Sequence, residues 1–292
     1  MNMIQSQSLD HIRGSEPQIL QWGRNTPLGN SSTRETRDQY FLESLNDELE
    51  ALSPKERLVR VFECFPSDIF ATVSGGVQSR VIPTLLQQLA DDELSLSPSI
   101  ESAPLVFLDT GDHFPETIDY VRSMKEDFGL DIRRVQHALS PGEFKIYQDA
   151  LVGLGKTEEE AFDWLTKVEP LRTLIEGERL KVWIAGNRRD QASSRSDLPF
   201  AERENGVIKI YPLADLTRED VRHLSEELAV PPHPLSGSYA SIGNQRDTKP
   251  WEEGMVQEKD GRHNGERTEC GLHTMWANRL LEKGVPIKEL GL

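Results

Sequence analysis

The sequence predicts an α/β fold: a twisted parallel sheet of about five strands, helices on both faces, and a largely irregular C-terminal tail. Short apolar runs of strand length alternate with stretches of helical periodicity along the middle of the chain. After about Pro231 this alternation stops, and Pro, Gly, Ser and charged residues predominate. Strands that alternate with helices form a parallel sheet through right-handed crossovers. Open α/β sheets bind ligands at the carboxyl ends of their strands.

The expected strands are short and mostly apolar, and they span residues 69–73, 105–108, 132–135, 182–185 and 207–211. Helices are expected over residues 81–89 and from Pro115 onward. Another is expected after Ser53, where Ser53-Pro54-Lys55-Glu56 has the form of a capping box with proline at the first helical position. Polar segments that contain glycine follow the first, second and fourth strands, so we expect a binding site there.

The 292 residues suit one or two domains and are enough to bury a substantial core. Residues 1–37 are polar and poor in aromatic residues, which predicts a disordered extension. The α/β domain is expected over residues 38–235. Residues 236–292 form the predicted tail, a mobile segment that closes over the site and ends in a short amphipathic helix over residues 275–283.

The chain carries 33 Lys and Arg against 49 Asp and Glu, which gives a net charge of −16. This balance disfavours binding to nucleic acid or to an anionic membrane. No apolar run approaches the ~18 residues of a membrane span, and no secretory signal is found at the N-terminus. The two cysteines, Cys64 and Cys270, exclude a disulfide scaffold and any site with four cysteine ligands. We therefore expect a cytoplasmic protein.

The segment after the first strand, Ser74-Gly75-Gly76-Val77-Gln78-Ser79, opens a helix. Glycines let a ligand approach the backbone, and a helix N-terminus offers free N–H groups to an anion. An ordinary turn between a strand and a helix would also contain such glycines. The segment resembles the PP-loop of the ATP-pyrophosphatase superfamily, SGGxDS. Gln78 stands where ATP-cleaving members have Asp, a carboxylate that helps to hold Mg²⁺. The resemblance therefore implies nucleotide binding without pyrophosphate cleavage.

Six further segments resemble, in order, motifs of the sulfonucleotide reductases. They read LDTGDHFPET from Leu108, KVEPL from Lys167, GNRRDQASSR from Gly186, IYPLADL from Ile210, YASIG from Tyr239 and ECGLH from Glu269. A single match carries little weight, but six in order carry much. Within this family the chain resembles the phosphoadenylyl-sulfate (PAPS) reductases.

This resemblance implies that the chain reduces an activated sulfate nucleotide to sulfite, with reduced thioredoxin or glutaredoxin as the electron donor. In this family the C-terminal cysteine, here Cys270, attacks the sulfonate sulfur and expels adenosine 3′,5′-bisphosphate. A reduced dithiol protein then cleaves the S-sulfocysteine that remains. The resemblance also implies a homodimer without a bound cofactor.

The residues around Cys270 suit this chemistry independently of the resemblance. Sulfonyl transfer to sulfur needs a soft nucleophile, and thiolate is the best that a side chain offers. A free cysteine has a pKa of about 8.5, so nearby cations are needed to lower it. His273, Arg262 and Arg267 are the candidates for that field and for holding the substrate. The alternative is that Cys270 is a small buried apolar residue. For Cys64 a place in the core is expected.

The substrate carries roughly four negative charges at neutral pH, so this acidic chain must concentrate cations locally. Arg188, Arg189 and Arg195 are the predicted group, because arginine binds phosphate bidentately. At least one of Arg188 and Arg189 is expected to face solvent, and Lys145 and Lys209 are weaker candidates. Asp109 is expected to position its loop rather than to transfer protons. The rest of the expected substrate-binding set is Ser74, Gly75, Gly76, Gln78, Thr110 and Gly111.

The adenylyl-sulfate (APS) reductases of this family hold a four-iron cluster on a Cys-Cys pair before KVEPL and a Cys-x-x-Cys after SIG. The corresponding residues here are Phe162-Asp163 and Asn244-Gln245-Arg246-Asp247, so neither a metal site nor an iron–sulfur cluster is expected. The cluster-free members typically take the 3′-phosphorylated substrate, which favours PAPS. The alternatives are a cluster-free APS reductase, an ATP-pyrophosphatase-type enzyme, and a non-catalytic nucleotide-binding or interaction protein.

Overall fold

The chain forms a six-stranded sheet that is parallel except at one edge. The structure is a computed structural model and describes residues 31–76, 78–128, 131–192, 195–239, 241–252 and Leu272. Its strands are β1 (Ile69–Val73), β2 (Leu105–Leu108), β3 (Ile132–Val135), β4 (Val182–Ile184), β5 (Ala201–Glu204) and β6 (Val207–Ile210). The strand order is β3-β2-β1-β4-β6-β5, and β5 pairs with β6 in the antiparallel direction. The predicted α/β class is confirmed.

Five of these strands lie where the sequence predicts them, but β5 was missed. Its residues, Ala201-Glu202-Arg203-Glu204, contain no apolar run. It forms a hairpin with β6 through Asn205 and Gly206, which have positive φ angles of 48° and 81°. Asn-Gly between two strands is the strongest short-range hairpin signal. The information on β5 was therefore in the turn rather than in the strand.

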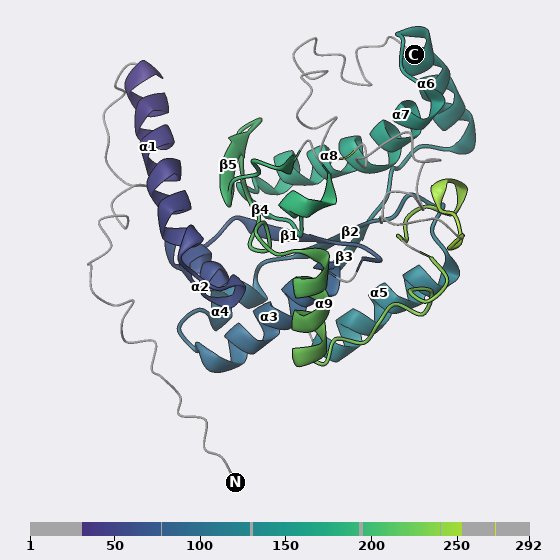
Figure 1. Cartoon of the computed structure of the whole chain (residues 1–292). Coiled ribbons are helices and arrows are strands. Elements are labelled where there is room, and N and C mark those ends of the chain that lie inside the picture. The colour runs from purple at the N-terminus through teal and green to yellow at the C-terminus, as the bar shows by residue number, and fades with distance from the viewer. Residues whose placement is uncertain are drawn as a thin grey trace. The chain divides into compact units, whose positions relative to one another are not determined.

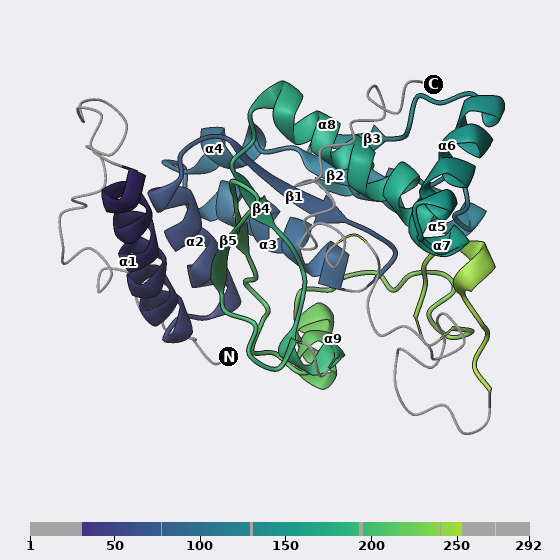
Figure 2. The ribbon, with the colours of Figure 1, turned by 90° about the horizontal axis from the view of Figure 1, so that it is seen from above.

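Helices cover both faces of the sheet, as predicted. The described α-helices are α1 (Ser31–Glu50), α2 (Pro54–Cys64), α3 (Gln78–Asp92), α4 (Ser97–Glu101), α5 (Pro115–Phe128), α6 (Pro141–Gly153), α7 (Glu158–Asp163), α8 (Glu169–Glu178) and α9 (Arg218–Glu227), and a π-helical turn, Trp164–Val168, joins α7 to α8. Figures 1 and 2 show α7 and α8 over one face of the sheet and α3, α5 and α9 over the other. Among the described helices, none is both long and apolar enough to cross a membrane.

The helix starts follow the capping signals of the sequence. At α2 the Ser53 N–H donates to the Glu56 carboxylate at 2.8 Å, and the Glu56 N–H donates to Ser53 Oγ at 3.4 Å. This is the predicted capping box, with Pro54 at the first helical position. The helix expected over residues 81–89 is part of α3, which begins earlier, at Gln78, because the glycine-rich loop leads directly into it.

The N-terminal boundary differs from the prediction. Helix α1 begins at Ser31, so the boundary expected after residue 37 lies inside a helix. The polar sequence of α1 hides its periodicity, but Leu45 and Leu49, one turn apart, are buried. Residues 1–30 lie outside the described residues, and the disordered extension expected there stays a prediction.

After α9 the chain runs back along α5 toward the carboxyl ends of the strands (Figure 1). We refer to residues 231–252 as the returning segment. It is fastened to α5 where the Tyr120 hydroxyl donates to Pro231 O at 2.8 Å. Isolated bridges also join Tyr239 to Pro250 and Asn244 to His113. The described part of the predicted tail is thus held by specific contacts. The helix expected over residues 275–283 lies outside the described residues.

Candidate active site

Three of the loops that carry predicted site residues leave the same edge of the sheet. Strand β1 pairs with β2 on one side and with β4 on the other, and both pairs are parallel. The loops after these three strands are therefore neighbours. They begin with Ser74, Asp109 and the Ala185-Gly186 pair. The topology thus brings the predicted groups of all three loops to one place, where α/β sheets bind ligands.

The loop after β1 is closed by hydrogen bonds among its own residues. The hydroxyl oxygens of Ser74 and Ser79 lie 2.8 Å apart. The Ser79 N–H donates to Gly76 O at 3.0 Å, and the Gly76 N–H approaches Ser74 Oγ at 3.4 Å. Because α3 begins at Gln78, the loop contains the N-terminus of a long helix. A glycine-containing loop at the N-terminus of a helix is the type of place at which proteins bind anions.

The Gln78 side chain packs against the glycines of two loops. A Cβ on Gly76 would lie 2.9 Å from Gln78 Nε2, and a Cβ on Gly186 would lie 3.0 Å from Gln78 Cγ. A side chain at either position would therefore require the Gln78 side chain to shift. The neutral amide of Gln78 stands where ATP-cleaving PP-loops have a carboxylate, so it offers no charge to a Mg²⁺ ion.

The returning segment covers the loop after β1. A Cβ on Gly75 would lie 3.3 Å from Ile242 and 3.6 Å from His233. The buried His233 ring accepts the Leu235 N–H at Nδ1, 3.1 Å away, so its proton is on Nε2. Nε2 in turn lies 3.0 Å from the Thr117 hydroxyl. Burial lowers the pKa of His233, which keeps the ring neutral in this arrangement.

The loop after β2 is organised by Asp109, which is 2% exposed. One carboxylate oxygen accepts the Gly111 N–H at 2.8 Å, and the other pairs with Arg134. The next residue, Thr110, donates its hydroxyl hydrogen to Asn244 Oδ1 at 2.8 Å. Both oxygens of Asp109 are engaged in holding the loop, which agrees with the positioning role expected for it.

A buried ion pair lies near this loop. Lys167, in the π-helical turn, approaches Asp163 at 2.5 Å, and both side chains are nearly inaccessible to solvent. His113 Nε2 lies 3.0 Å from Leu108 O. Burial lowers the pKa of His113, and the charge of Lys167 adds to this shift. Lys167 is therefore close enough to influence the loop after β2.

The loop after β4 brings two arginines together through Gln191. Arg188 is 1% exposed, and its Nε donates to Asp190 at 2.9 Å. Gln191 Oε1 accepts hydrogen bonds from the backbone N–H of Arg188 at 3.1 Å and from the side-chain Nη1 of Arg195 at 2.5 Å. The loop thus places a buried guanidinium and a half-buried one at a strand end, the chemistry that binds phosphate.

The expectation that Arg188 or Arg189 faces solvent is wrong. Arg188 is buried, and the half-buried Arg189 guanidinium lies 4.9 Å from the Phe200 ring centroid and donates to Leu198 O at 2.8 Å. The two lysine candidates are engaged by neighbouring carboxylates. The buried Lys209 pairs with Glu204, and the exposed Lys145 pairs with Asp149 at 2.7 Å.

Three residues of this region received no role in the sequence analysis. Asn244 follows the YASIG motif, Lys167 opens KVEPL, and His233 lies in a proline-rich stretch. The motifs located the first two. Asn244 contacts Thr110, 134 positions away along the chain, whereas Lys167 pairs with Asp163, only four positions away. No sequence signal marked His233, because a single histidine between prolines is common in surface loops.

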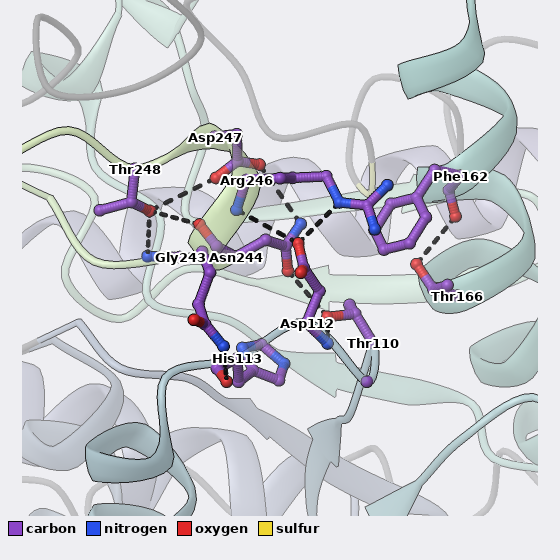
Figure 3. A network of polar contacts seen from close by, with 12 residues as sticks. Thr110, Asp112, His113, Phe162, Thr166, Gly243, Asn244, Arg246, Asp247 and Thr248 are labelled. Carbon is purple, nitrogen blue, oxygen red and sulfur yellow. Dashed lines mark hydrogen bonds and ion pairs between the residues drawn. The ribbon is translucent and has the colours of Figure 1, made fainter.

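The residues at the expected cluster positions do not fit an iron–sulfur cluster, which takes cysteine thiolates. Phe162 is covered by the Arg246 guanidinium, whose carbon lies 3.7 Å from the ring centroid (Figure 3). Asp163 pairs with Lys167, and the buried Asn244 is occupied by hydrogen bonds.

Four predicted site residues, Cys270, His273, Arg262 and Arg267, lie outside the described residues. Leu272, between two of them, is described and buried. Cys64 is buried on α2, and burial raises the pKa of its thiol to about 11. The prediction that Cys64 belongs to the core is confirmed.

Residues 68–250, more than half of the chain, match the family model of the phosphoadenosine phosphosulfate reductase domain. The chain belongs to this family. It is 33% identical over 239 residues to a phosphoadenosine 5′-phosphosulfate reductase of Aliivibrio salmonicida, covering 80% of this chain and 88% of that protein. It is 34% identical over 233 residues to the protein of the same name from Photobacterium profundum, with the same shares covered.

Solved structures agree with the family assignment. A crystal structure of the PAPS reductase from Candida auris, determined as a phosphate complex, matches with a TM-score of 0.55 and 30% identity. The match covers 72% of this chain and 97% of that chain. Yeast FAD synthetase in complex with FAD matches with a TM-score of 0.50 but only 14% identity, so it shares the fold alone. Membership of the PAPS reductase family supports sulfonucleotide reduction as the activity of this chain.

Proposed function

We propose that this chain reduces 3′-phosphoadenylyl sulfate to sulfite and adenosine 3′,5′-bisphosphate, with reduced thioredoxin as the electron donor. One observation carries the proposal. Three motifs of the family, on the loops after β1, β2 and β4, meet at one sheet edge in a chain whose residues 68–250 match the family model. The relatives named above carry the name of that enzyme.

The described loops offer two kinds of anion-binding group. The N–H groups at Ser74, Gly75, Gly76 and the start of α3 suit one phosphate. The guanidinium groups of Arg188, Arg189 and Arg195, on the loop after β4, are proposed to bind another phosphate. Asp109, Thr110 and Gly111 shape the neighbouring loop, and Gln78 fills the space between the loops. Arg262 and Arg267 are proposed to add further charge from the C-terminal segment.

The first step is sulfonyl transfer to Cys270. Its thiolate attacks the sulfonate sulfur, a sulfur–sulfur bond forms, and the bond from sulfur to the bridging oxygen of the phosphate breaks. The electron pair of that bond leaves with adenosine 3′,5′-bisphosphate. His273, three residues away, is proposed to stabilise the thiolate by its charge.

The second step supplies two electrons. A thiolate of the reduced donor attacks the sulfur of Cys270, and sulfite leaves with the electron pair of the sulfur–sulfur bond, so its sulfur falls from oxidation state six to four. The second donor thiol then closes the donor disulfide and releases the Cys270 thiolate. Glutaredoxin would supply the same dithiol. This chemistry requires a reducing compartment, which supports a place in the cytoplasm, and we propose a homodimer as in the family.

Two arguments favour PAPS over APS as the substrate. The residues at the cluster positions are not cysteines, and the 3′-phosphate of PAPS adds negative charge that arginines can bind. The 3′-phosphate adds a doubly charged group, and two charge-assisted hydrogen bonds of about 1.5–3 kcal/mol each would give roughly 10²- to 10⁴-fold preference. The test is release of sulfite from each nucleotide with reduced thioredoxin, and we expect the higher kcat/KM for PAPS. Equal values would make this a cluster-free APS reductase. Absence of sulfite with either nucleotide and either donor would contradict the proposed function.

A further inference from the structure

The turn at residues 243–248 is fastened to the loop after β2 by backbone and side-chain contacts (Figure 3). The Gln245 N–H donates to Asp112 O at 2.6 Å, and Gln245 Nε2 donates to His113 O at 2.8 Å. Asn244, which is buried, accepts the Thr110 hydroxyl. This turn occupies the sequence positions of the Cys-x-x-Cys of cluster-bearing relatives.

Arg246 extends from this turn to two other segments. Its Nε donates to Asp112 Oδ2 at 2.7 Å. Its guanidinium carbon lies 3.7 Å from the centroid of the Phe162 ring, which is van der Waals contact of a planar cation with an aromatic face. Phe162 belongs to α7, directly before Asp163, whose carboxylate pairs with Lys167 in the π-helical turn. We name the contact of Asp112, Arg246 and Phe162 the arginine clamp.

We propose that Arg246 is a positioning residue for sulfonyl transfer, because the arginine clamp fixes the loop after β2 relative to the turn that carries Lys167. This inference rests on the proposed function. The two segments that supply cluster thiolates in relatives touch here through a cation on an aromatic ring. In this chain a cation–aromatic contact therefore joins the two segments that a metal cluster joins in the cluster-bearing relatives.

The clamp acts on the geometry of the reaction rather than on nucleotide affinity. None of its three residues belongs to the glycine-rich loop or to the arginine group after β4. The two segments that it joins carry Thr110, which bonds with Asn244, and Lys167, which pairs with Asp163. A misplacement of about 1 Å among reacting groups lowers a rate by as much as 10²-fold.

The test compares Arg246→Ala with the unchanged chain. We expect kcat for PAPS to fall by about 10- to 100-fold, while the dissociation constant of adenosine 3′,5′-bisphosphate changes by less than about threefold. Arg222→Ala is the matched control, because Arg222 is 49% exposed against 51% for Arg246 and is also ion-paired, with Glu219 and Glu226 on α9. Its kcat should stay within about twofold.

Two further variants separate the clamp from simple support of the fold. Arg246→Lys keeps a charge for Asp112 but loses the planar stack, so an intermediate kcat is expected. In the pair Arg246→Ala and Phe162→Leu, the double variant should be little slower than Arg246→Ala alone, since both changes break one contact.

The outcomes distinguish this inference from the proposed function. If the wild-type chain is active and the Arg246→Ala variant keeps the wild-type kcat, the positioning role of Arg246 is wrong, while the proposed function stands. Equal losses of kcat and product affinity, together with a lowered melting temperature, also overturn it, because they indicate a merely structural role. If the wild-type chain releases no sulfite, the proposed function is wrong, and so is the positioning role of Arg246, which rests on it.

Discussion

The two cysteines of this chain lie in different chemical settings. Cys64 is on the buried face of α2, and burial raises the pKa of its thiol to about 11. At pH 8 only about 0.1% of such a thiol is ionised, far less than for a free cysteine with a pKa near 8.5. Cys270 stands in a polar, glycine-containing segment with His273 and arginines nearby in sequence. This difference predicts that the Cys270 thiol reacts with the substrate and that the Cys64 thiol does not.

Replacement of each cysteine in turn tests this. Cys270→Ser should abolish sulfite release by several orders of magnitude, because a hydroxyl is harder to ionise and a poorer nucleophile at sulfur. Binding of adenosine 3′,5′-bisphosphate, measured by calorimetry, should persist. Cys64→Ala is the control and should retain turnover, since alanine leaves no unpaired polar group in the core. Similar losses in both variants would indicate a dithiol mechanism instead.

The positions of the site residues were predictable from the sequence, but the directions of their side chains were not. The motifs placed Ser74, Asp109 and Arg188 at strand ends, which fixes them at one edge of the sheet. The Arg189 guanidinium instead covers Phe200, which directly precedes β5. That strand has no apolar run, and the Asn205-Gly206 turn that indicates it gives no information on which side chain covers Phe200.

Among the elements, the returning segment is held in part by one neutral histidine. His233 Nδ1 accepts the Leu235 N–H, and Nε2 bonds with the Thr117 hydroxyl on α5. Protonation of Nδ1 would remove the first contact. Of the groups packed on the ring, Glu116 favours the charged form, whereas burial, the larger effect, favours the neutral one. The Tyr120 ring meets it edge-on.

This arrangement predicts loosening of the returning segment in acid. The folded pKa of His233 is lowered, so its contribution to stability is complete above the unfolded value, near 6.5, and is lost as the pH falls toward the lowered value. The measurement is hydrogen exchange of the Leu235 amide, corrected for its intrinsic pH dependence. Between the unfolded and the folded pKa of His233, exchange should accelerate by up to about tenfold for each pH unit by which the pH falls.

A non-titrating amide provides the comparison for that measurement. His233→Asn should flatten the pH dependence, because the asparagine oxygen can accept the Leu235 N–H at every pH. His223→Asn, at an exposed position on α9, should leave the dependence unchanged. A pH-dependent exchange that survives in His233→Asn would assign the effect to another group.

The strands and the returning segment differ in how far the sequence determines them. Apolar runs predicted β1 and β2 to the residue, because a buried parallel strand needs apolar side chains on both faces. The edge strand β3 also has its predicted bounds, although two of its four residues are arginines and none is fully buried. The docking of Asn244 on Thr110 joins polar residues 134 positions apart. Such a contact follows from the assembled fold, and local periodicity carries no information about it.

On the scale of the whole molecule, several cations in the described part of the chain are committed to carboxylates. Arg57, Arg80 and Lys209 are buried and pair with Asp215, Asp127 and Glu204 respectively. In a chain of net charge −16, each such pair uses a positive group of the described residues that could otherwise meet a substrate with roughly four negative charges. This concentrates the expected anion binding in the loop after β4 and in the C-terminal segment.

The composition of the whole chain also predicts that its activity is independent of iron. Two cysteines cannot provide the four thiolates of a four-iron cluster, and the positions of those thiolates hold an aromatic–cation contact, an ion pair and a buried amide. Protein from iron-supplemented cells should show no visible absorption band. Incubation with EDTA should leave both sulfite release and the melting temperature unchanged. Stoichiometric iron, together with loss of turnover on its removal, would contradict this and would require ligands other than cysteine.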